Sequence, residues 1–267
     1  MYRLIFLGTS SGDMISRKGS NGIVFIIDDF QILIDPGPSL LQKARDYNVK
    51  LENTNLILVS HNHLTHCNDL NLLIETMTYR GMDNKGILIG DDATIYGTRF
   101  ERPILGRRQE KLLERVVALK EKEKVNLGTL KIEALKTKHC NMAIGFKIHI
   151  EKFILTYTGD TAYFKEMKEE YKNSNLMILN NVKPFNYKSD NNLTSEDTVK
   201  ILKEVKPQFA IITHFGKLMQ SVNPIYEARE IQRSTDIQTV AAKEGLMIDP
   251  LSYSNALRQK TLDIKKL

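Results

Sequence analysis

Short apolar runs recur along the chain, and most of them have the length and residue types of β-strands. The runs 22–27 and 30–35 are separated only by Asp28 and Asp29, which predicts a β-hairpin. The pattern closes with the segment GLMIDP near the end of the chain. We expect strands over residues 4–8, 22–27, 30–35, 55–61, 87–90, 130–136, 143–150, 153–159, 175–180 and 209–215.

Between these runs we expect helices over 40–47, 67–79, 163–172, 194–204 and 224–234. The highly charged segment 107–124 is also expected to be helical, with a partly irregular structure as the alternative. In the helix 67–79, one face carries Leu70, Leu73, Ile74 and Met77. The helix 194–204 opens at Thr194 or Ser195 with Glu196 and Asp197 in its first turn, a helix-start signal. Residues 184–192 read as a loop.

Strands that alternate with helices in both halves of the chain predict a layered α/β protein. The sequence offers no clean linker, so we expect one domain over residues 1–267. Hydrophobic residues are 42% and charged residues 26% of the chain, which is typical of a folded protein and argues against wholesale disorder. Apolar runs all stay well short of the ~18 residues that a transmembrane helix needs.

The charge balance is mildly basic, with 38 Lys and Arg against 32 Asp and Glu and a net charge of +6. This favours acidic partners such as phosphates or nucleic acid, although a lysine-rich surface gives the same balance. The two cysteines cannot build a disulfide framework, and the N-terminus lacks the small-residue cleavage site of a secretory signal. We therefore expect a cytoplasmic protein with no membrane partner.

Histidines carry most of the candidate chemistry. Three of them, His61, His63 and His66, lie in the segment SHNHLTH, which follows an apolar strand. Alternate side chains of an extended segment point to the same side, so His61 and His63 can face one metal ion and His66 can reach a second. Imidazole suits zinc, iron and similar ions. The segment therefore predicts a metal site.

Other polar residues follow apolar strands in the same way. His139, Asp160 and His214 each stand where a strand is expected to run into a loop, the usual place for chemistry in α/β folds. His149 is the exception, because it lies in the middle of a strand, and we interpret it as a structural or surface residue.

The segment SHNHLTH resembles the HxHxDH signature of the metallo-β-lactamase superfamily. Further motifs follow the order of that superfamily: LGTSSG at 7–12, DPG at 35–37, TGDT at 158–161 and THFG at 213–216. The GDT motif and the LT-x-E-D start of the helix near residue 194 look closest to the ribonuclease Z-like and phosphodiesterase branch. The resemblance implies a four-layer αβ/βα sandwich with two metal ions at the edges of its sheets.

The resemblance also implies a ligand set. His61, His63 and His139 would hold the first ion, and His66 and His214 the second, with Asp160 bridging the two. Asp35 would support the ligand loop without binding metal. Two divalent ions are implied, with zinc expected and manganese or iron as alternatives. The superfamily also makes a homodimer plausible.

Two positions depart from the family pattern. The aspartate between the second and third histidines is Thr65 here, so the second ion would have one fewer anionic ligand and would bind more weakly. A histidine that can protonate a leaving group is replaced by Asn192, which donates a hydrogen bond but no proton. Cys67, Cys140 and Asp69 lie close enough in sequence to be weak alternative ligands.

The function that we expect is that of a metal-dependent hydrolase, a phosphodiesterase that attacks RNA or a small phosphodiester with a metal-activated water. The short segment between Asp160 and His214 leaves no room for a long arm and argues against full tRNA 3′-processing. The alternatives are a hydrolase of an ester, thioester or lactone, and a catalytically weak relative that binds metal or nucleic acid. Basic residues that would suit a phosphodiester, or simply form a solvated surface, are Arg17, Lys18, Arg107, Arg108, Lys138, Lys183 and Lys188.

Overall fold

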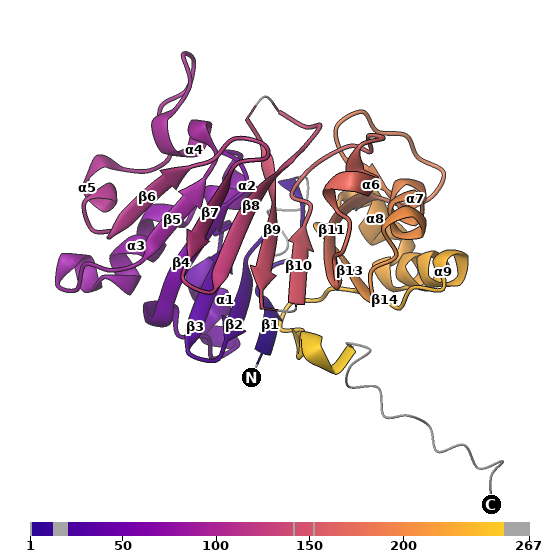
Figure 1. Ribbon diagram of the computed structural model, residues 1–267, viewed down its shortest axis with the longest axis horizontal. Coiled ribbons are helices and arrows are strands. Elements are labelled where there is room, and N and C mark those ends of the chain that lie inside the picture. Colours follow the sequence, from indigo (N-terminus) through magenta and orange to yellow (C-terminus); the bar gives the residue numbers. More distant parts are fainter. Residues whose placement is uncertain (1, 13–20, 141, 152, 254–267) are drawn as a thin grey trace, which may run out of the picture.

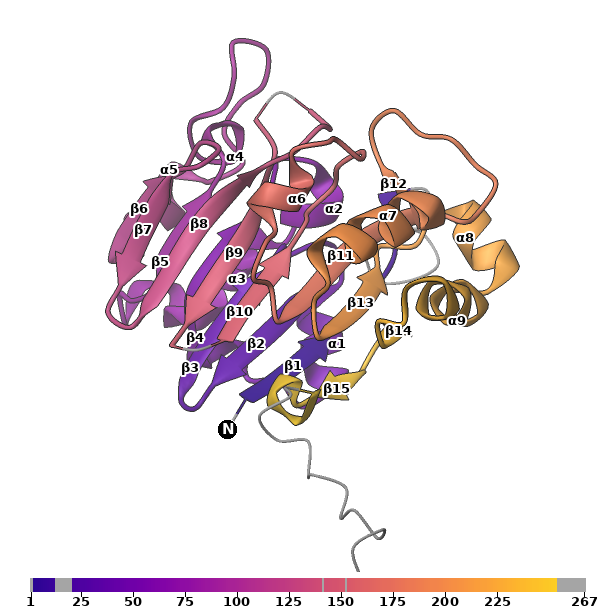
Figure 2. The same ribbon diagram turned by 45° about the vertical axis from the view of Figure 1, so that its right-hand side comes forward.

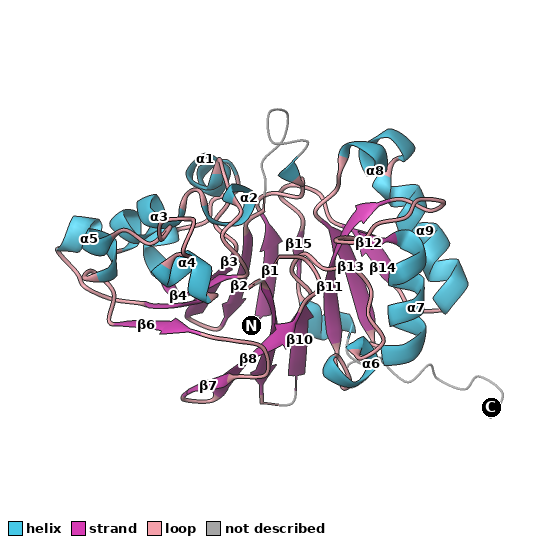
Figure 3. Cartoon of the chain, turned by 90° about the horizontal axis from the view of Figure 1, so that it is seen from above, coloured by secondary structure: helices cyan, strands magenta, loops and turns pink. Residues whose placement is uncertain are grey.

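The computed structural model describes residues 2–12, 21–140, 142–151 and 153–253. Two β-sheets face each other, and helices cover their outer faces (Figures 1 and 3). The first sheet has the order β15-β1-β2-β3-β4-β5-β6, and the second has the order β14-β13-β11-β10-β9-β8-β7, with β12 paired to β11. This is the expected four-layer αβ/βα sandwich.

The first sheet is built from strands β1 (Tyr2–Phe6), β2 (Ile23–Ile27), β3 (Phe30–Ile34), β4 (Thr54–Val59), β5 (Ile87–Gly90), β6 (Arg115–Ala118) and β15 (Met247–Ile248). The second sheet contains β7 (Lys124–Leu127), β8 (Leu130–Lys136), β9 (Ile144–Ile150), β10 (Phe153–Tyr157), β11 (Leu176–Lys183), β12 (Leu193–Thr194), β13 (Phe209–Thr213) and β14 (Thr239–Ala241).

Helices on the first half of the chain are α1 (Leu40–Asp46), α2 (Leu64–Cys67), α3 (Leu70–Met77), α4 (Asp92–Tyr96) and α5 (Arg107–Glu110). Those on the second half are α6 (Met167–Glu170), α7 (Ser195–Val205), α8 (Lys217–Val222) and α9 (Pro224–Thr235). Short 3-10 turns cover Leu51–Asn53, Tyr79–Gly81 and Pro250–Tyr253. Figure 2 shows α7 and α9 lying along the outer side of the second sheet.

Three apolar layers hold the sandwich together. Successive side chains of a strand point to opposite faces, so Leu4 packs between the sheets while Ile5 packs under the helices of the first sheet. The central layer joins residues of both sheets, such as Phe25 and Phe146. A third layer joins the second sheet to α7 and α9. Because each sheet is buried on two faces, the positions of the strand ends are fixed by a large core.

Several expected elements are confirmed. The hairpin forms with Ile27 opposite Phe30 and turns at Asp28 and Asp29. The predicted face of the helix after the histidine segment is buried in α3. Thr194 caps helix α7: its side chain accepts from the Asp197 backbone N–H, and the Asp197 side chain accepts from the Thr194 backbone N–H. This reciprocal cap is the one that the sequence signal predicts.

The expected helix over 107–124 is wrong. Only Arg107–Glu110 is helical, and residues Arg115–Ala118 form β6, which extends the first sheet by pairing with β5. Val116 and Val117 are β-branched and therefore favour a strand. The edge of β5 supplies the backbone hydrogen-bonding partners that this strand needs. The helix expected over 163–172 is also shorter than predicted, because only Met167–Glu170 is helical.

Candidate metal centre

The loops after four strands meet at one edge of the sandwich. His61 follows β4, His139 follows β8, Asp160 follows β10 and His214 follows β13. The two sheets are tied together here, since the backbone N–H of Ile144 donates to the carbonyl of Ser60 over 2.9 Å. Residues that are far apart in the sequence are thereby brought into one site.

Three histidines form the first group of donors. His61 Nε2 lies 2.9 Å from His63 Nδ1, and His63 Nδ1 lies 3.2 Å from His139 Nε2. Nitrogen ligands at 2.0–2.1 Å from a tetrahedral zinc ion are about 3.3 Å apart. The spacing of these three nitrogens therefore fits a shared divalent ion. His61 is fully buried, whereas His63 is exposed, so the group faces solvent on one side.

Asp160 lies at the junction with a second group. Its Oδ2 atom is 3.4 Å from His66 Nε2, 3.3 Å from His214 Nε2 and 3.8 Å from His139 Nε2. One carboxylate oxygen thus contacts histidines from both expected ligand sets. This is the position that a bridging ligand requires, and all six predicted ligands lie in one cluster.

The other ring nitrogen of four histidines is held by a neighbouring group. The contacts are His61 Nδ1 to Ser60 Oγ at 3.0 Å, His66 Nδ1 to Asp35 Oδ2 at 2.7 Å, His139 Nδ1 to the Asn191 carbonyl at 2.7 Å and His214 Nδ1 to Asn21 Oδ1 at 3.0 Å. An acceptor on Nδ1 fixes the proton there and leaves Nε2 free as a donor to metal. The residues present therefore fit a divalent metal ion.

Asp35 supports the ligand loop as expected. Its carboxylate accepts from the Ser60 backbone N–H at 2.7 Å and from the Tyr157 hydroxyl at 2.5 Å, besides its contact with His66. Asp35 adopts a left-handed backbone conformation with φ of 52°. A non-glycine residue in that region is strained and is kept there by its surroundings.

Sequence reasoning missed three buried side chains of this network. Asn21 lies 3.0 Å from His214 and 2.7 Å from His66, Asn180 donates to Asp160 Oδ1 over 2.7 Å, and the Tyr157 hydroxyl reaches Asp35. Nothing in the local sequence separates these residues from ordinary strand or loop residues. Their only signal is that each stands near a strand end at the ligand edge.

Charge and burial shape the acid–base state of the cluster. Burial lowers the pKa of His61 and of His63, and repulsion from the neighbouring imidazoles acts in the same direction, which keeps these rings neutral. Burial also opposes the charged form of His66, but the carboxylates of Asp160 and Asp35 raise the pKa of this ring to about 10. The neutral rings of the first group are the form that binds metal.

Thr65 and Asn192 both face the cluster. They line a cavity of about 400 Å³ together with Ser11, Gly12, His63, Leu64, His139, Asp160, Val182, Lys183 and His214. Thr65 lies in α2, and the turn at Gly37 approaches it so closely that a Cβ atom at Gly37 would lie 2.1 Å from the Thr65 carbonyl oxygen. The two departures from the family pattern thus stand at the site itself.

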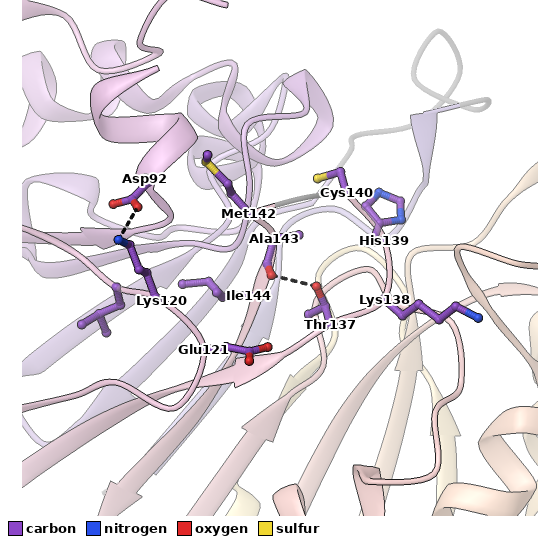
Figure 4. A pocket seen from close by; sticks show the side chains of 11 residues that line it. Asp92, Lys120, Glu121, Thr137, Lys138, His139, Cys140, Met142, Ala143 and Ile144 are labelled. Carbon is purple, nitrogen blue, oxygen red and sulfur yellow. Dashed lines mark hydrogen bonds and ion pairs between the residues drawn. The ribbon is translucent and has the colours of Figure 1, made fainter. Parts of the chain in front are cut away.

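The weaker ligand candidates have other contacts. Asp69 accepts from the backbone N–H of Leu40 over 2.9 Å, and the Cys67 thiol donates to the His63 carbonyl over 3.2 Å. Cys140 follows His139 and lines a neighbouring cavity of about 610 Å³ (Figure 4). Among the described residues, neither sulfur belongs to a group whose donor atoms converge.

Only some of the basic residues that would suit a phosphodiester lie at the site. Lys183 lines the cavity of the cluster and Lys138 the neighbouring one. Arg108 instead lies 3.4 Å from Glu75 on the first-sheet side. Arg17 and Lys18 lie outside the described residues. His149 sits in mid-strand and contacts Glu133 over 3.3 Å, as a structural or surface residue would.

This arrangement of fold and donors coincides with a known family. Residues 31–215 match the β-lactamase superfamily domain, which is more than half of the chain, so the protein belongs to that superfamily. The coarse activity follows from membership: the protein is a metal-dependent hydrolase whose fold binds divalent metal ions.

Individual relatives place the chain beside ribonucleases Z. It is 26% identical over 255 residues to an uncharacterised protein of Methanocaldococcus jannaschii, covering 93% of this chain and 95% of the relative. It is 22% identical to a ribonuclease Z of Sulfolobus acidocaldarius, covering 95% and 98% of the two chains. The second of these relatives supports the ribonuclease Z-like branch.

A solved structure shares the fold over nearly the same length. The metallo-β-lactamase fold protein YhfI from Bacillus subtilis superimposes with a TM-score of 0.77 at 20% identity, covering 92% of this chain and 98% of the other. Within the residues that the structure describes, every helix is too short or too polar to cross a membrane.

Proposed function

We propose that the protein is a phosphodiesterase that uses two divalent metal ions, with zinc as the expected metal. His61, His63 and His139 would hold one ion, His66 and His214 the other, and Asp160 both. The observation that carries this proposal is the position of Asp160 Oδ2, within 3.8 Å of His66, His139 and His214. The name of the Sulfolobus relative, ribonuclease Z, supports the choice of a phosphodiester.

When bound, such ions act as Lewis acids and lower the pKa of a coordinated water towards neutrality. The chain's own residues prepare for that chemistry. Asn21 and Asp35 orient the rings of His66 and His214, and Asn180 holds the Asp160 carboxylate. Because these groups are fixed before substrate arrives, little reorganisation is needed during the reaction.

Asn192 and Lys183 also line the cavity of the cluster and suit a phosphodiester. The Asn192 amide can donate a hydrogen bond to the oxygen of a leaving group, although it cannot supply a proton. The Lys183 ammonium can balance phosphate charge. We therefore expect substrates whose leaving group departs readily without protonation to be hydrolysed fastest.

The test combines metal analysis with substrate panels. Protein purified without added metal should contain two divalent ions per chain, or one tight ion and a second that titrates in. It should hydrolyse bis(p-nitrophenyl) phosphate faster than aryl thioesters or lactones. Preference for thioesters or lactones would favour the alternative hydrolase. Bound metal without turnover on either panel would instead indicate a catalytically weak metal- or nucleic-acid-binding relative.

A further inference from the structure

A loop projects from the molecule between α4 and α5, and we name residues 97–105 the projecting arm (Figures 1 and 2). Its base is pinned, since the backbone N–H groups of Ile104 and Leu105 both donate to the Thr94 carbonyl, at 3.0 and 3.1 Å. Asn71 adds a side-chain contact to the Ile104 carbonyl at 2.8 Å. The arm is therefore held to the first half of the molecule.

The tip of the arm is a built turn. Thr98 Oγ1 accepts from the backbone N–H groups of Phe100 and Glu101 over 3.1 and 3.0 Å, and the Thr98 N–H donates to the Glu101 carbonyl over 2.8 Å. Gly97 enters the turn with φ of 77°, and a Cβ there would lie 2.6 Å from the Glu101 carbonyl. A tip fixed in this way loses little entropy when a ligand binds.

The arm is also tied to the histidine loop. The amide of Asn62, which stands between His61 and His63, donates to the Glu101 carboxylate over 2.6 Å. Movement of the arm tip is thus coupled to the segment that carries two of the proposed ligands. This contact places the arm against the loop that carries those ligands.

An aromatic ring and a guanidinium are presented at this tip. The Phe100 side chain is 80% exposed. The Arg99 guanidinium lies 4.3 Å from the centre of the Phe100 ring. A phenylalanine so exposed contributes little to folding. The ring can stack against a planar base, and the cation can balance the negative charge of a nucleic-acid backbone.

A cavity of about 650 Å³ lies against this pair. We name it the arm cavity. It is lined by Asn62, Ala93, Thr98, Arg99, Phe100, Glu101, Cys140 and Met142. Cys140 and Met142 also line the cavity of Figure 4, which includes His139. The arm cavity therefore lies next to the cavity that His139 lines, and its size is in the range of about 300–1,000 Å³ typical of small-molecule sites.

We propose that the arm cavity binds a nucleobase of a single-stranded RNA substrate, stacked on Phe100 and backed by Arg99, while the adjoining phosphodiester occupies the metal centre. This subsite rests on the proposed phosphodiesterase function and specifies its substrate class. Stacking on an aromatic ring accepts any base, because every base has a π-face. The subsite thus favours nucleotide substrates over small alkyl phosphodiesters without reading a sequence.

The chain has no tryptophan, so a single one reports on the arm alone. Phe100→Trp should show fluorescence that a short single-stranded oligoribonucleotide quenches in a saturable way. An oligomer of the same length built from abasic residues should quench at least 10-fold less. The matched control is Tyr226→Trp, whose parent ring is 62% exposed with the Arg229 guanidinium 5.9 Å from its centre, but on α9. Its emission should not respond.

Kinetics give a second readout. Phe100→Ala should raise the KM for an oligoribonucleotide by roughly 5- to 100-fold, the range expected from loss of one base stack. Its kcat on bis(p-nitrophenyl) phosphate at saturating substrate should change far less than its KM for RNA, because Phe100 is not one of the donors of the metal centre and saturation masks a change in binding. Phe100→Tyr should restore the KM of the native chain.

Three results would overturn the subsite: equal quenching by base-containing and abasic oligomers, quenching only by an aryl thioester, or an unchanged oligoribonucleotide KM in Phe100→Ala. Failure of the proposed function looks different. If the native chain hydrolysed no phosphodiester while Phe100→Trp was still quenched selectively by RNA, the subsite would stand and the phosphodiesterase would not.

Discussion

Asp160 is the residue on which the proposed two-metal centre depends most. It contacts histidines of both donor groups through one oxygen, and Asn180 holds its other oxygen. Loss of a partner that only orients a ligand costs about 10- to 100-fold in activity or metal affinity. We expect Asp160→Ala to cost more than 100-fold in kcat, and Asn180→Ala to cost less.

The measurement is turnover of bis(p-nitrophenyl) phosphate together with bound metal per chain for both variants. The loss of turnover in Asp160→Ala is compared with the losses in His61→Ala and His214→Ala. A mononuclear site would be preferred if Asp160→Ala kept most of the native turnover.

Thr65 gives the sharpest test of how this chain differs from its relatives. The side chain lines the cavity of the cluster, and α2 is held in place by the close approach of the Gly37 turn. Thr65→Asp would add an anionic ligand beside the second group. We expect tighter binding of the second ion, by 10-fold or more, without a change at the first site.

Titration of zinc into metal-free native and Thr65→Asp chains, followed by calorimetry, measures the two affinities. Thr65→Asn serves as control, because it adds a polar side chain of similar shape without the charge. An unchanged second-site affinity in Thr65→Asp would mean that position 65 does not face the ions.

Histidine positions could be predicted from the sequence because three imidazoles on one short loop have few other uses. The residues that hold them could not. Asn21 lies 193 positions from His214 in sequence, yet their side chains are in contact. Such pairs depend on how the two sheets meet, and that geometry is decided by the core as a whole and leaves no local pattern.

Among the secondary-structure elements, α4 carries an acidic cap with an unusual environment. Asp91 is fully buried and accepts from the backbone N–H groups of Ala93 and Thr94 at the start of the helix. Burial raises the pKa of its carboxyl from 3.8 to about 6, although these hydrogen bonds oppose the shift. The folded chain therefore binds this proton more tightly than the unfolded chain.

The sign of the effect on stability follows from that difference. Between about pH 4 and pH 6 the folded state holds more protons, so the contribution of Asp91 to stability falls as the pH rises through this window. Asp91→Asn keeps a capping oxygen but cannot ionise. The unfolding free energy of Asp91→Asn minus that of the native chain should be roughly 1 kcal/mol more positive at pH 8 than at pH 5.

Urea unfolding at the two pH values measures this difference. Asp91→Ser, which also keeps a capping oxygen and cannot ionise, should show the same dependence on pH. A gain that is equal at both pH values would contradict a raised pKa for Asp91.

The elements themselves could be predicted to different degrees. Helix α7 carries its own cap and the β2–β3 hairpin its own two-residue turn, so local sequence was sufficient for both. The segment 107–124 is rich in charged residues, which favoured a helix, yet β6 forms within it. Its structure is decided by the open edge of β5, a tertiary contact that local periodicity does not encode.

At the scale of the whole molecule, the layers lead us to expect that the fold persists when the metal centre is removed. Three apolar clusters hold the sheets and helices together, and the proposed ligands lie beyond the strand ends. The single-domain organisation and the homodimer expected from the sequence remain predictions. Sedimentation of the purified chain, with and without zinc, measures the oligomeric state.

Metal binding should nevertheless stabilise the molecule as a whole. An ion that binds only the folded state adds about 2.7 kcal/mol when its free concentration is 100 times its Kd. At roughly 2–4 °C per kcal/mol for chains of similar size, zinc should raise the Tm of the metal-free protein by roughly 5–10 °C. The double variant His61→Ala/His63→Ala should keep a native circular dichroism spectrum but lose most of this increase, because the first group of donors is gone. His149→Ala, which removes a histidine in mid-strand, should keep the full increase. An equal rise in Tm in the double variant would show that zinc binds elsewhere, whereas collapse of its spectrum would show that the ion is part of the core that holds the fold.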